Sequence, residues 1–356
     1  MIWYCLIIIV LFWGYICNKP KVYYWLGLLL MFIITAFRDP ALGGDIILYR
    51  SFFDSVPTIF GKIKEIDTSY TIGYVWLNML VKTFVSDYRA YQVVYTLLTM
   101  FLLHVVLFKL RVSDKDKCLI LLSYFCFKFL WFFWNTLRQN IADLLFWLFL
   151  IAYYKNEIRS KVKKLLFVCT GLALPALFHS SAWLNFLFFP VMLYIGRWKG
   201  KKRMFLVIAI SLTLFVISST IFASLLDAII MYVDSRYTMY EEAEAGNANI
   251  INYALKMLFF ILFTLHYDKE DYPYKKMILD GLTMVVLIGS VNQELLARVY
   301  EYYAISLYVS FGFVTHYFQS FDKRLVAFVF TLAMVVIFMR FVMITDEGMY
   351  MDFRFW

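Results

Sequence analysis

The sequence predicts an all-α, polytopic integral membrane protein with about twelve transmembrane helices and one further re-entrant or surface helix. Composition is the first observation behind this prediction, because 63% of the 356 residues are hydrophobic and only 17% are charged. Soluble domains are about 45–50% apolar and about 25% charged. The second observation is that the apolar residues fall into runs near the length of about 20 residues that spans a bilayer. A soluble enzyme, a disordered chain and a nucleic-acid-binding protein are therefore poor fits.

Twelve apolar runs are predicted to cross the membrane within a single transmembrane domain, 1–356. The first run lacks the basic start and the cleavage site of a signal peptide, so we expect a retained helix. The five cysteines all lie in apolar runs, which favours buried thiols over a disulfide framework. The predicted spans are 1–17, 22–37, 90–108, 118–134, 140–154, 164–178, 181–196, 204–226, 251–267, 277–291, 301–318 and 325–344.

Four short basic loops predict the orientation of these spans, since the positive-inside rule places such loops in the cytoplasm. The four placements agree only if an even number of spans separates each pair of loops. The loops contain Lys19 and Lys21; Lys109, Arg111, Lys115 and Lys117; Lys155, Arg159, Lys161, Lys163 and Lys164; and Arg197, Lys199, Lys201, Lys202 and Arg203.

One further apolar segment, 70–85, violates this condition if it crosses the membrane. It contains Gly73, Asn78 and Lys82. A re-entrant or surface-lying helix on the outer side restores agreement and lets its polar residues line a cavity. We prefer that solution to the alternative, a misassigned N-terminal helix. Both termini are then expected outside the cytoplasm.

Two outer segments stand out in this arrangement: a large loop, 38–89, with amphipathic or re-entrant helices, and a polar loop, 227–250, which could act as a lid. The net charge of +9 divides unevenly between the sides. Lys outnumbers Arg 16 to 5 in the inner loops, whereas Arg leads 8 to 5 elsewhere. Arginine suits sites where a planar donor holds phosphate or carboxylate. The outer side is therefore predicted to bind an anion, with pairing to nearby acids as the alternative.

The first group of candidate site residues follows the second span. Arg38 begins it, and Gly43-Gly44 allows a tight turn before Asp45, which is expected to cap the next helix. Tyr49 lies four residues beyond Asp45, on or near the same helix face. The simpler interpretation is a capped amphipathic helix on the membrane surface, which explains Asp45 better than Arg38.

The second and third groups lie at predicted outer turns. Arg138, Gln139 and Asn140 are consecutive hydrogen-bond donors beside tryptophans at the membrane boundary. Charged residues at such depth are costly and usually serve a site or pair with one another. His179, in Phe-His-Ser-Ser-Ala, could act as a base. A polar turn and a structural histidine are the respective alternatives.

The fourth group is a helical segment in which Glu294 and Arg298 have the spacing of an i,i+4 salt bridge. Tyr302 and Tyr303 follow, and tyrosine rings also suit sugars. Arg340, deeper within a span, is expected to face the bundle interior. The sequence contains no metal-binding motif and no P-loop, so neither a metal nor another cofactor is expected.

The order of these motifs resembles the EpsG family of Wzy-type polymerases, which make exopolysaccharide, capsule and O-antigen. Leu-Arg-Gln-Asn-Ile-Ala at 137–142 and Phe-His-Ser-Ser-Ala at 178–182 are the most specific pieces. The Gly-Gly-Asp-Ile turn at 43–46 departs from the more usual Gly-Thr-Asp-Tyr, and Arg298-x-x-x-Tyr302 completes the pattern. The resemblance covers nearly the whole chain.

This resemblance implies a GT-C-like glycosyltransferase in the bacterial inner membrane, with its active site facing the periplasm. Donor and acceptor would both be oligosaccharides linked to undecaprenyl pyrophosphate, and transfer would be inverting. The implied partners also include membrane lipids, a chain-length regulator and a flippase of the same pathway, and no nucleic acid. The residues expected to bind pyrophosphate are Arg38, Arg138, Arg298 and Arg340. Those expected to take part in catalysis are Asp45, His179 and Arg138. Those expected to bind the sugar or the acceptor are Tyr49, Gln139, Tyr302 and Tyr303.

Two other classes remain open from the sequence. A lipid-linked oligosaccharide flippase should show repeated halves and polar residues through the whole membrane depth, whereas here the polar groups gather on the outer side. A membrane O-acyltransferase also uses an intramembrane histidine and arginine, but it needs a cytoplasmic route for its acyl donor. The short, lysine-rich inner loops suggest no such route.

Overall fold

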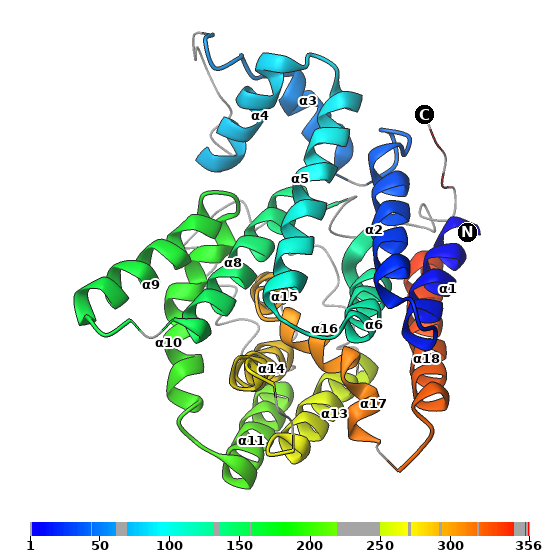
Figure 1. Cartoon of the computed structure of the whole chain (residues 1–356). Coiled ribbons are helices and arrows are strands. Elements are labelled where there is room, and N and C mark those ends of the chain that lie inside the picture. The colour runs from blue at the N-terminus through cyan, green and yellow to red at the C-terminus, as the bar shows by residue number, and fades with distance from the viewer. Residues whose placement is uncertain are drawn as a thin grey trace. The chain divides into compact units, whose positions relative to one another are not determined.

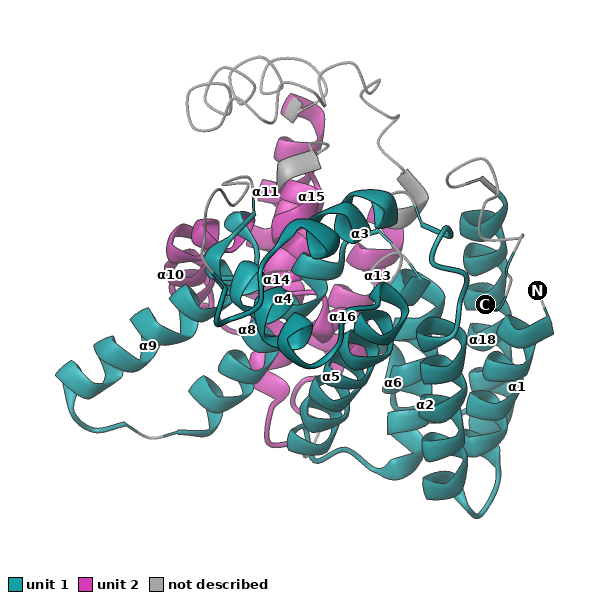
Figure 2. Ribbon diagram, turned by 90° about the horizontal axis from the view of Figure 1, so that it is seen from above, with its two compact units in different colours: residues 1–180, 311–356 teal, residues 181–310 magenta. Residues whose placement is uncertain are grey.

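A computed structural model describes residues 2–43, 45–61, 70–130, 135–156, 158–218, 250–269, 272–291, 294–318, 320–344, 353 and 355. Over these residues every regular element is helical, and one isolated bridge pairs Arg38 with Phe355. The all-α prediction is confirmed. The chain forms two compact units, which Figure 2 colours separately: residues 1–180 with 311–356, and residues 181–310.

The first unit contains α-helices, which Figure 1 labels, and one short π-helical turn. They are α1 (Ile2–Ile16), α2 (Pro20–Ala36), α3 (Ile46–Ser55), α4 (Ile72–Phe84), α5 (Tyr88–Lys109), α6 (Asp114–Tyr124), a π-helical turn η1 (Phe125–Phe129), α8 (Leu137–Lys155), α9 (Lys161–Ala176), α17 (Val314–Tyr317) and α18 (Lys323–Ile344). Within this unit α2 packs against α1, α5 and α6, and α8 packs against α5 and α9.

The second unit contains a 3₁₀-helical turn and six α-helices in its described residues. These are η2 (Ser180–Leu184), α10 (Asn185–Ile195), α11 (Gly200–Ser218), α13 (Ile250–His266), α14 (Lys275–Gly289), α15 (Glu294–Glu301) and α16 (Ile305–Gly312). Helix α14 is the centre of this unit, because it packs against α10, α11, α13 and α15. Nearly all of its side chains are buried.

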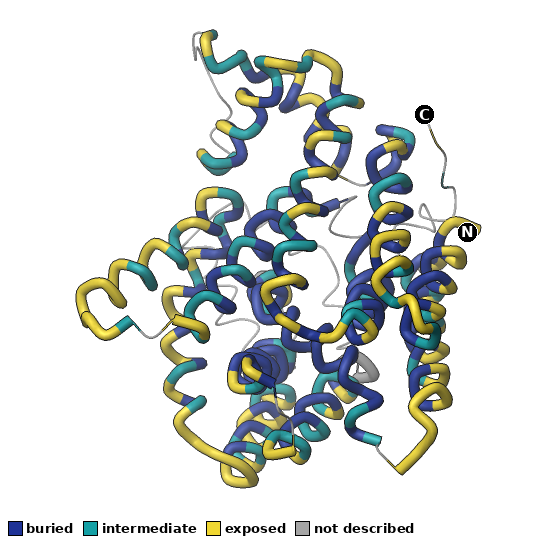
Figure 3. The backbone as a smooth tube through the Cα atoms, in the orientation of Figure 1, coloured by how far each residue is buried: buried dark blue, intermediate teal, exposed yellow. Residues whose placement is uncertain are grey.

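Two described helices are long and apolar enough to cross a membrane, Tyr88–Lys109 and Lys323–Met343. Shorter apolar helices are Ile2–Ile16, Pro20–Ala36, Ser180–Ile195 and Tyr253–His266. Many large apolar side chains are exposed, and α9 is exposed over most of its length (Figure 3). Such surfaces suit a lipid environment, in which apolar side chains gain nothing by turning inward.

Over the described residues each predicted run contains helix, although 118–134 and 204–226 end outside those residues, 181–196 begins with the 3₁₀ turn η2, and 301–318 is not one continuous helix. The chain there divides into the end of α15, then α16 and α17. Successive amide groups bond to carbonyls three residues earlier: Tyr302 to Val299, Tyr303 to Tyr300 and Ala304 to Glu301. These tight turns interrupt the α-helical pattern before α16. The segment is therefore less regular than its apolar composition predicts.

Local sequence explains where several helices begin. Pro20 starts α2, a position where its missing amide hydrogen costs nothing. Three other helices in the same unit have side-chain caps: Asp87 accepts from the Arg89 amide at α5, Ser113 from the Asp116 amide at α6, and Ser160 from the Lys163 amide at α9. Each cap satisfies a backbone donor that the helix itself leaves unpaired.

Candidate functional site

Arg138 lies against tyrosine rings in the first turn of α8. Its guanidinium carbon is 4.7 Å from the ring centre of Tyr70 and 6.0 Å from that of Tyr74. The guanidinium also forms a hydrogen bond with the hydroxyl of Tyr49. Cation–π contacts of this kind hold an arginine in place while leaving its edge free to donate hydrogen bonds. Arg138 itself is half-buried.

Tyr49 and Phe52 lie on α3, Tyr74 lies on α4, and Tyr70 precedes α4. Phe52 of α3 stacks on Tyr70, with ring centres 3.9 Å apart, and on Tyr74 at 5.8 Å. Tyr49 meets the edge of Tyr74 at 5.9 Å. We call Tyr49, Phe52, Tyr70 and Tyr74 the aromatic cluster. The sequence predicted Tyr49 but missed Tyr70 and Tyr74; Tyr70 lies before α4, so the i,i+4 rule for helices does not connect the two tyrosines.

Lys82 holds α3 and α4 together. Its ammonium donates to the carbonyls of Phe53 (2.8 Å) and Asp54 (2.6 Å), which lie at the carboxyl end of α3. A cation at that end also complements the helix dipole. Partial burial lowers the pKa of Lys82. Lys82, one of the polar residues within 70–85, thus joins α3 to α4.

The start of α4 is attached to the turn that precedes His179. The Gly73 amide donates to the Leu177 carbonyl at 2.8 Å, and the Thr71 hydroxyl donates to the Phe178 carbonyl at 2.6 Å. A Cβ atom at Gly73 would lie 2.7 Å from the Leu177 oxygen, so only glycine permits this approach. His179 is buried and follows this turn directly. Two predicted site regions, around Arg138 and His179, are therefore linked through α4.

Tyr49 remains protonated at physiological pH. Burial raises the pKa of Tyr49 to about 12, and Asp45 adds to the increase, while the positive charge of Arg138 opposes it. The neutral hydroxyl can donate or accept hydrogen bonds, as the recognition of a sugar hydroxyl requires. Asp45 and Tyr49 are thus electrostatic neighbours, in agreement with the predicted shared face.

The expected capping role of Asp45 is not seen. Asp45 occupies the position before α3, but its side chain makes no capping hydrogen bond to the helix. Its backbone is helical rather than extended, and an extended backbone is what normally turns a cap side chain back onto the helix. Gly44 lies outside the described residues.

Arg38 is buried at the end of α2 and contacts the backbone. Its guanidinium donates to the carbonyls of Thr35 (3.1 Å) and Leu42 (3.3 Å). Gln92 of α5 donates to the carbonyls of Thr35, Ala36 and Arg38. These bonds satisfy carbonyl groups that the helix end leaves unpaired. The contacts give Arg38 a role in holding the turn that leads to Asp45.

Gln139 is buried beside Arg138 in the first turn of α8. Asn140 follows, and its Oδ1 atom accepts a hydrogen bond from the Tyr124 hydroxyl at 3.3 Å. The Tyr95 hydroxyl donates to the Leu137 carbonyl. Tyrosines of α5 and α6 therefore position the turn from which Arg138 extends.

The comparison with protein families decides the identity at the family level. The sequence model of the EpsG family matches residues 21–354, nearly the whole chain. The chain belongs to the EpsG family. This family is associated with Wzy-type polymerases, so the chain is a membrane protein and an enzyme of polysaccharide biosynthesis. No curated protein and no solved structure matches the chain.

The second unit of this EpsG-family protein contains the other predicted tyrosines. Tyr302 and Tyr303 are fully buried. The Tyr302 hydroxyl lies 3.1 Å from the Ser181 Oγ atom, so these two groups share a hydrogen bond. Neither ring presents a face for a sugar in this structure. Arg298, on α15, is half-buried, and the side chain of Glu294 lies outside the described residues.

Arg340 differs from its prediction. The sequence placed this residue in the bundle interior, but on α18 its side chain is exposed. A long arginine side chain can extend along a helix toward a polar boundary, which removes the need for an interior partner. The possible lid, 227–250, lies outside the described residues except for the backbone at Ile250.

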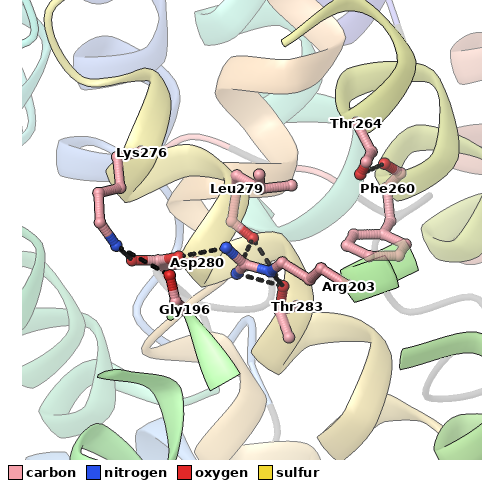
Figure 4. Close-up of polar contacts among 8 residues, drawn as sticks. All are labelled: Gly196, Arg203, Phe260, Thr264, Lys276, Leu279, Asp280 and Thr283. Atoms are coloured by element: carbon pink, nitrogen blue, oxygen red, sulfur yellow. Dashed lines mark hydrogen bonds and ion pairs between the residues drawn. The ribbon is translucent and has the colours of Figure 1, made fainter. Parts of the chain in front are cut away.

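The basic loop 197–203 contains a residue that the sequence analysis treated only as an orientation signal. Arg203 is buried and its Nη1 atom donates to Asp280 Oδ1 at 2.6 Å (Figure 4). Its Nη2 atom donates to Thr283 Oγ1 at 2.6 Å and to the Leu279 carbonyl at 3.0 Å, and its Nε atom to Thr283 at 3.2 Å. Lys276 reaches the other oxygen of Asp280 at 2.8 Å. We call this group the Arg203 network.

Among the described residues no three His, Cys, Asp or Glu side chains gather in a way that could hold a metal ion. The groups that the structure brings together on the first unit are instead a guanidinium, tyrosine hydroxyls and aromatic rings. Such groups can bind an anion and hydroxyl-bearing rings. Their chemistry suits the binding of a sugar phosphate.

Proposed function

We propose that this protein is a polymerase that joins oligosaccharide repeat units, each carried on undecaprenyl pyrophosphate, into a surface polysaccharide. Membership of the EpsG family supports an enzyme of polysaccharide biosynthesis. The observation that carries the finer assignment is Arg138, held against Tyr70 and Tyr74 with its side chain half-buried. A preorganised guanidinium of this kind stabilises the charge that develops on a departing pyrophosphate.

The proposed reaction is inverting transfer without a metal ion. The hydroxyl oxygen of the acceptor sugar attacks the anomeric carbon of the donor glycan. The bond between that carbon and the phosphate oxygen breaks, and undecaprenyl pyrophosphate leaves with the bonding electrons. A base takes the hydroxyl proton, and Asp45 and His179 are the two candidates.

The other predicted residues are assigned by their surroundings. Tyr49 and Gln139 flank Arg138 and would bind the acceptor. Arg298, which is half-buried, and Arg340, which is exposed, would also contact pyrophosphate. Arg38 would act through the turn that it holds. Tyr302 and Tyr303 would reach a sugar only after the second unit rearranges, since both rings are buried.

The proposal extends to topology and partners. The chain would cross the inner membrane about twelve times in a GT-C-like arrangement, with 38–89 on the periplasmic side and 70–85 as a re-entrant or surface helix. Donor and acceptor would both enter from the outer leaflet, where a flippase of the same pathway delivers them. A chain-length regulator would act on the growing product.

Gel profiles of surface glycan from cells test this proposal directly. A deletion strain should accumulate product with a single repeat, and the wild-type gene should restore long chains. A strain without any product would indicate a flippase, and full-length glycan lacking acyl groups would indicate an acyltransferase. Either result would overturn the proposed polymerase.

Point variants then test the site at matched protein levels. Arg138→Ala should abolish long chains, and Arg138→Lys should restore them only in part because lysine lacks the planar fork. Arg197→Ala is the matched control, since this arginine also lies over a tyrosine ring, Tyr194, at 5.7 Å. The control should keep normal chains. Long chains in both Arg138→Ala and His179→Ala would refute the site assignment.

A further inference from the structure

The segment between α10 and α11 is a short basic turn that has no role in the proposed transfer reaction. Residues 197–202 read Arg-Trp-Lys-Gly-Lys-Lys, so they carry four cations and no acid. All four cationic side chains are exposed: Arg197, Lys199, Lys201 and Lys202. We call residues 197–202 the basic turn. Positive charge beside a membrane span is in general an orientation signal, but the surroundings of this turn suit a further role.

Both ends of the basic turn are fixed on one buried carboxylate, Asp280 of α14 (Figure 4). After the turn, Arg203 donates to Asp280 Oδ1 at 2.6 Å. Before the turn, Gly196 packs so closely on the same atom that a Cβ there would lie 2.9 Å from it. The Gly196 carbonyl also accepts a hydrogen bond from Lys276 at 3.4 Å. The charges between these two anchors are therefore held close together before any ligand binds, which lowers the cost of binding.

Backbone hydrogen bonds make the turn compact. The Arg197 amide donates to the Tyr194 carbonyl at 3.2 Å, and the Trp198 amide donates to the Ile195 carbonyl at 3.1 Å. Gly200 begins α11 with a φ of 54°, in the left-handed region that favours glycine. The chain thus passes from one helix to the next over a few residues.

Two exposed aromatic side chains accompany the cations. Trp198 lies within the turn and is 45% exposed, and Tyr194 lies at the end of α10 and is 61% exposed. The guanidinium carbon of Arg197 is 5.7 Å from the ring centre of Tyr194. Tryptophan and tyrosine are enriched where a membrane meets water, because one part of each ring is apolar and another is polar. The turn therefore combines positive charge with the residues typical of the headgroup region.

The two helices that flank the turn expose apolar side chains. Leu187 and Val191 are exposed on α10, and Phe205 and Val216 are exposed on α11. In a membrane protein such side chains contact acyl chains. A ligand that carries acyl chains would therefore gain contacts that a soluble anion cannot make.

The charges around the turn leave its cations available to an anion. Asp280 is buried and already pairs with two cations of the Arg203 network. The described part of the segment between α13 and α14 contains one exposed acid, Asp268, together with Lys269, Lys275 and Lys276. The amino end of α11 adds a partial positive charge. The field at the turn therefore favours a negatively charged partner.

We propose that the basic turn binds the headgroup of an anionic phospholipid of the surrounding bilayer. The three lysines of the turn contact the phosphate, and Trp198 and Tyr194 lie at the level of the headgroup. The acyl chains cover the exposed apolar side chains of α10 and α11. This inference goes beyond the proposed polymerase and requires only that the chain is a membrane protein.

Two combined variants separate a lipid site from general surface charge. The first replaces the three lysines of the turn with glutamine: K199Q, K201Q and K202Q. The second is the matched control, because it removes the same number of exposed lysines at the start of α9: K161Q, K163Q and K164Q. Loss of lipid binding is expected in the first variant and not in the second.

Gly196→Ala tests the fixed geometry without changing any charge. The added methyl group would lie 2.9 Å from Asp280 Oδ1, and Arg203 and Lys276 hold that carboxylate in place. The turn must then move away from α14. Lipid affinity should fall several-fold if the anchored turn positions the lysines, whereas a site that depends on charge alone would keep its affinity.

The measurement is thermal unfolding of the purified full chain in a neutral detergent, titrated with phosphatidylglycerol. Phosphatidylcholine is the reference for acyl chains without net charge, and glycerol phosphate at equal ionic strength is the reference for a soluble headgroup. Phosphatidylglycerol should raise the unfolding temperature of wild type and of the α9 control to a saturating value, and neither reference should do so. The apparent affinity should fall about tenfold or more when the three lysines of the turn are replaced.

Four results would overturn this inference. Wild type could show no rise with phosphatidylglycerol, or the two lysine variants could lose affinity equally, which would indicate general charge. Glycerol phosphate alone could give the same rise, which would indicate a soluble anion. Undiminished affinity in Gly196→Ala would refute the anchored turn. None of these results bears on the polymerase, which the glycan profile of the deletion strain tests separately.

Discussion

Arg138 in the first unit and Arg203 in the second occupy opposite kinds of environment. All three guanidinium nitrogens of Arg203 donate to acceptors within the protein, and the side chain is 2% exposed. Arg138 lies on tyrosine rings, is half-buried, and its Nε atom has no hydrogen-bond partner among the described residues. All the guanidinium nitrogens of Arg203 are therefore hydrogen-bonded within the protein, whereas Arg138 retains a donor that a ligand could use.

This difference shows that residue type alone does not assign a function to an arginine. The sequence treats Arg203 as part of a lysine-rich orientation signal, and the structure makes it the centre of a buried ion pair. A buried pair is weak evidence for net stability, but breaking it is costly because one charge remains without its partner. The comparison therefore predicts that loss of the Arg203 ion pair lowers the stability of the protein, whereas substitution of Arg138 lowers its activity.

The largest expected effect is on folding and comes from the Arg203 network. Asp280→Ala should destabilise the protein by about 3–5 kcal/mol, because it leaves the Arg203 charge buried without a counterion. Denaturant unfolding in detergent and protein abundance in cells measure this loss. The double variant Arg203→Met with Asp280→Leu should recover much of the stability. If Asp280→Ala unfolds like wild type, the buried ion pair does not matter for stability, and the proposed difference between Arg203 and Arg138 is wrong.

The next effect is on activity and comes from Arg138. Arg138→Ala should lower the rate of polymerisation about 100- to 1,000-fold, which is typical for the loss of one preorganised donor. The unfolding free energy should change by less than about 1 kcal/mol, since Arg138 is half-buried and its ring contacts are modest. Chain-length gels and unfolding curves on the same samples test both parts. A large loss of stability would show that Arg138, like Arg203, is needed for folding.

Gly73→Ala tests whether α4 must stay attached to the turn before His179. The added methyl group would lie 2.7 Å from the Leu177 oxygen, so α4 must move. Overpacking of this kind costs about 1–3 kcal/mol, and the aromatic cluster beneath Arg138 should shift with α4. Polymer length should fall at matched protein levels. Thr213→Val is the control, since that hydroxyl donates to the Ala209 carbonyl of its own helix; equal losses in both variants would contradict the attachment.

The smallest effect is expected at the edge of the Arg203 network. Lys276 also pairs with Asp280, but its side chain is 53% exposed. Solvent screens the Lys276 charge, and Arg203 still neutralises Asp280 in the variant, so Lys276→Met should leave both the unfolding curve and the glycan profile close to wild type. A cost comparable with that of Asp280→Ala would show that the lysine, and not Arg203, neutralises the buried acid.

The sequence predicted several parts of the site for local reasons. Arg138 stands out because a charge at a membrane boundary is costly, and Tyr49 because it follows Asp45 by one helical turn. Tyr70 and Tyr74 were missed, and Tyr70 lies before the helix that carries Tyr74, so no helical spacing connects them. Their partner could not be found locally, because Arg138 is more than 60 residues away in the chain.

Two other features that the sequence analysis did not find also depend on distant parts of the chain, and a third is local. Asp280 and Arg203 are 77 residues apart, so no spacing rule connects them. Arg340 was assigned to the interior from its depth in a span, but which side of α18 it occupies depends on what that helix packs against. The interruption of 301–318 arises from tight turns that an apolar composition does not reveal.

By itself the sequence determined that the protein is a helical membrane protein of the EpsG family, because apolar run length, charge placement and motif order are all local properties. Only the tertiary structure decided that Arg203 is fully hydrogen-bonded within the protein and that Arg138 faces the aromatic cluster. The physical reason is that desolvation and hydrogen bonding depend on groups brought together from distant parts of the chain. A guanidinium has the same charge at 138 and at 203, and its neighbours decide what that charge does.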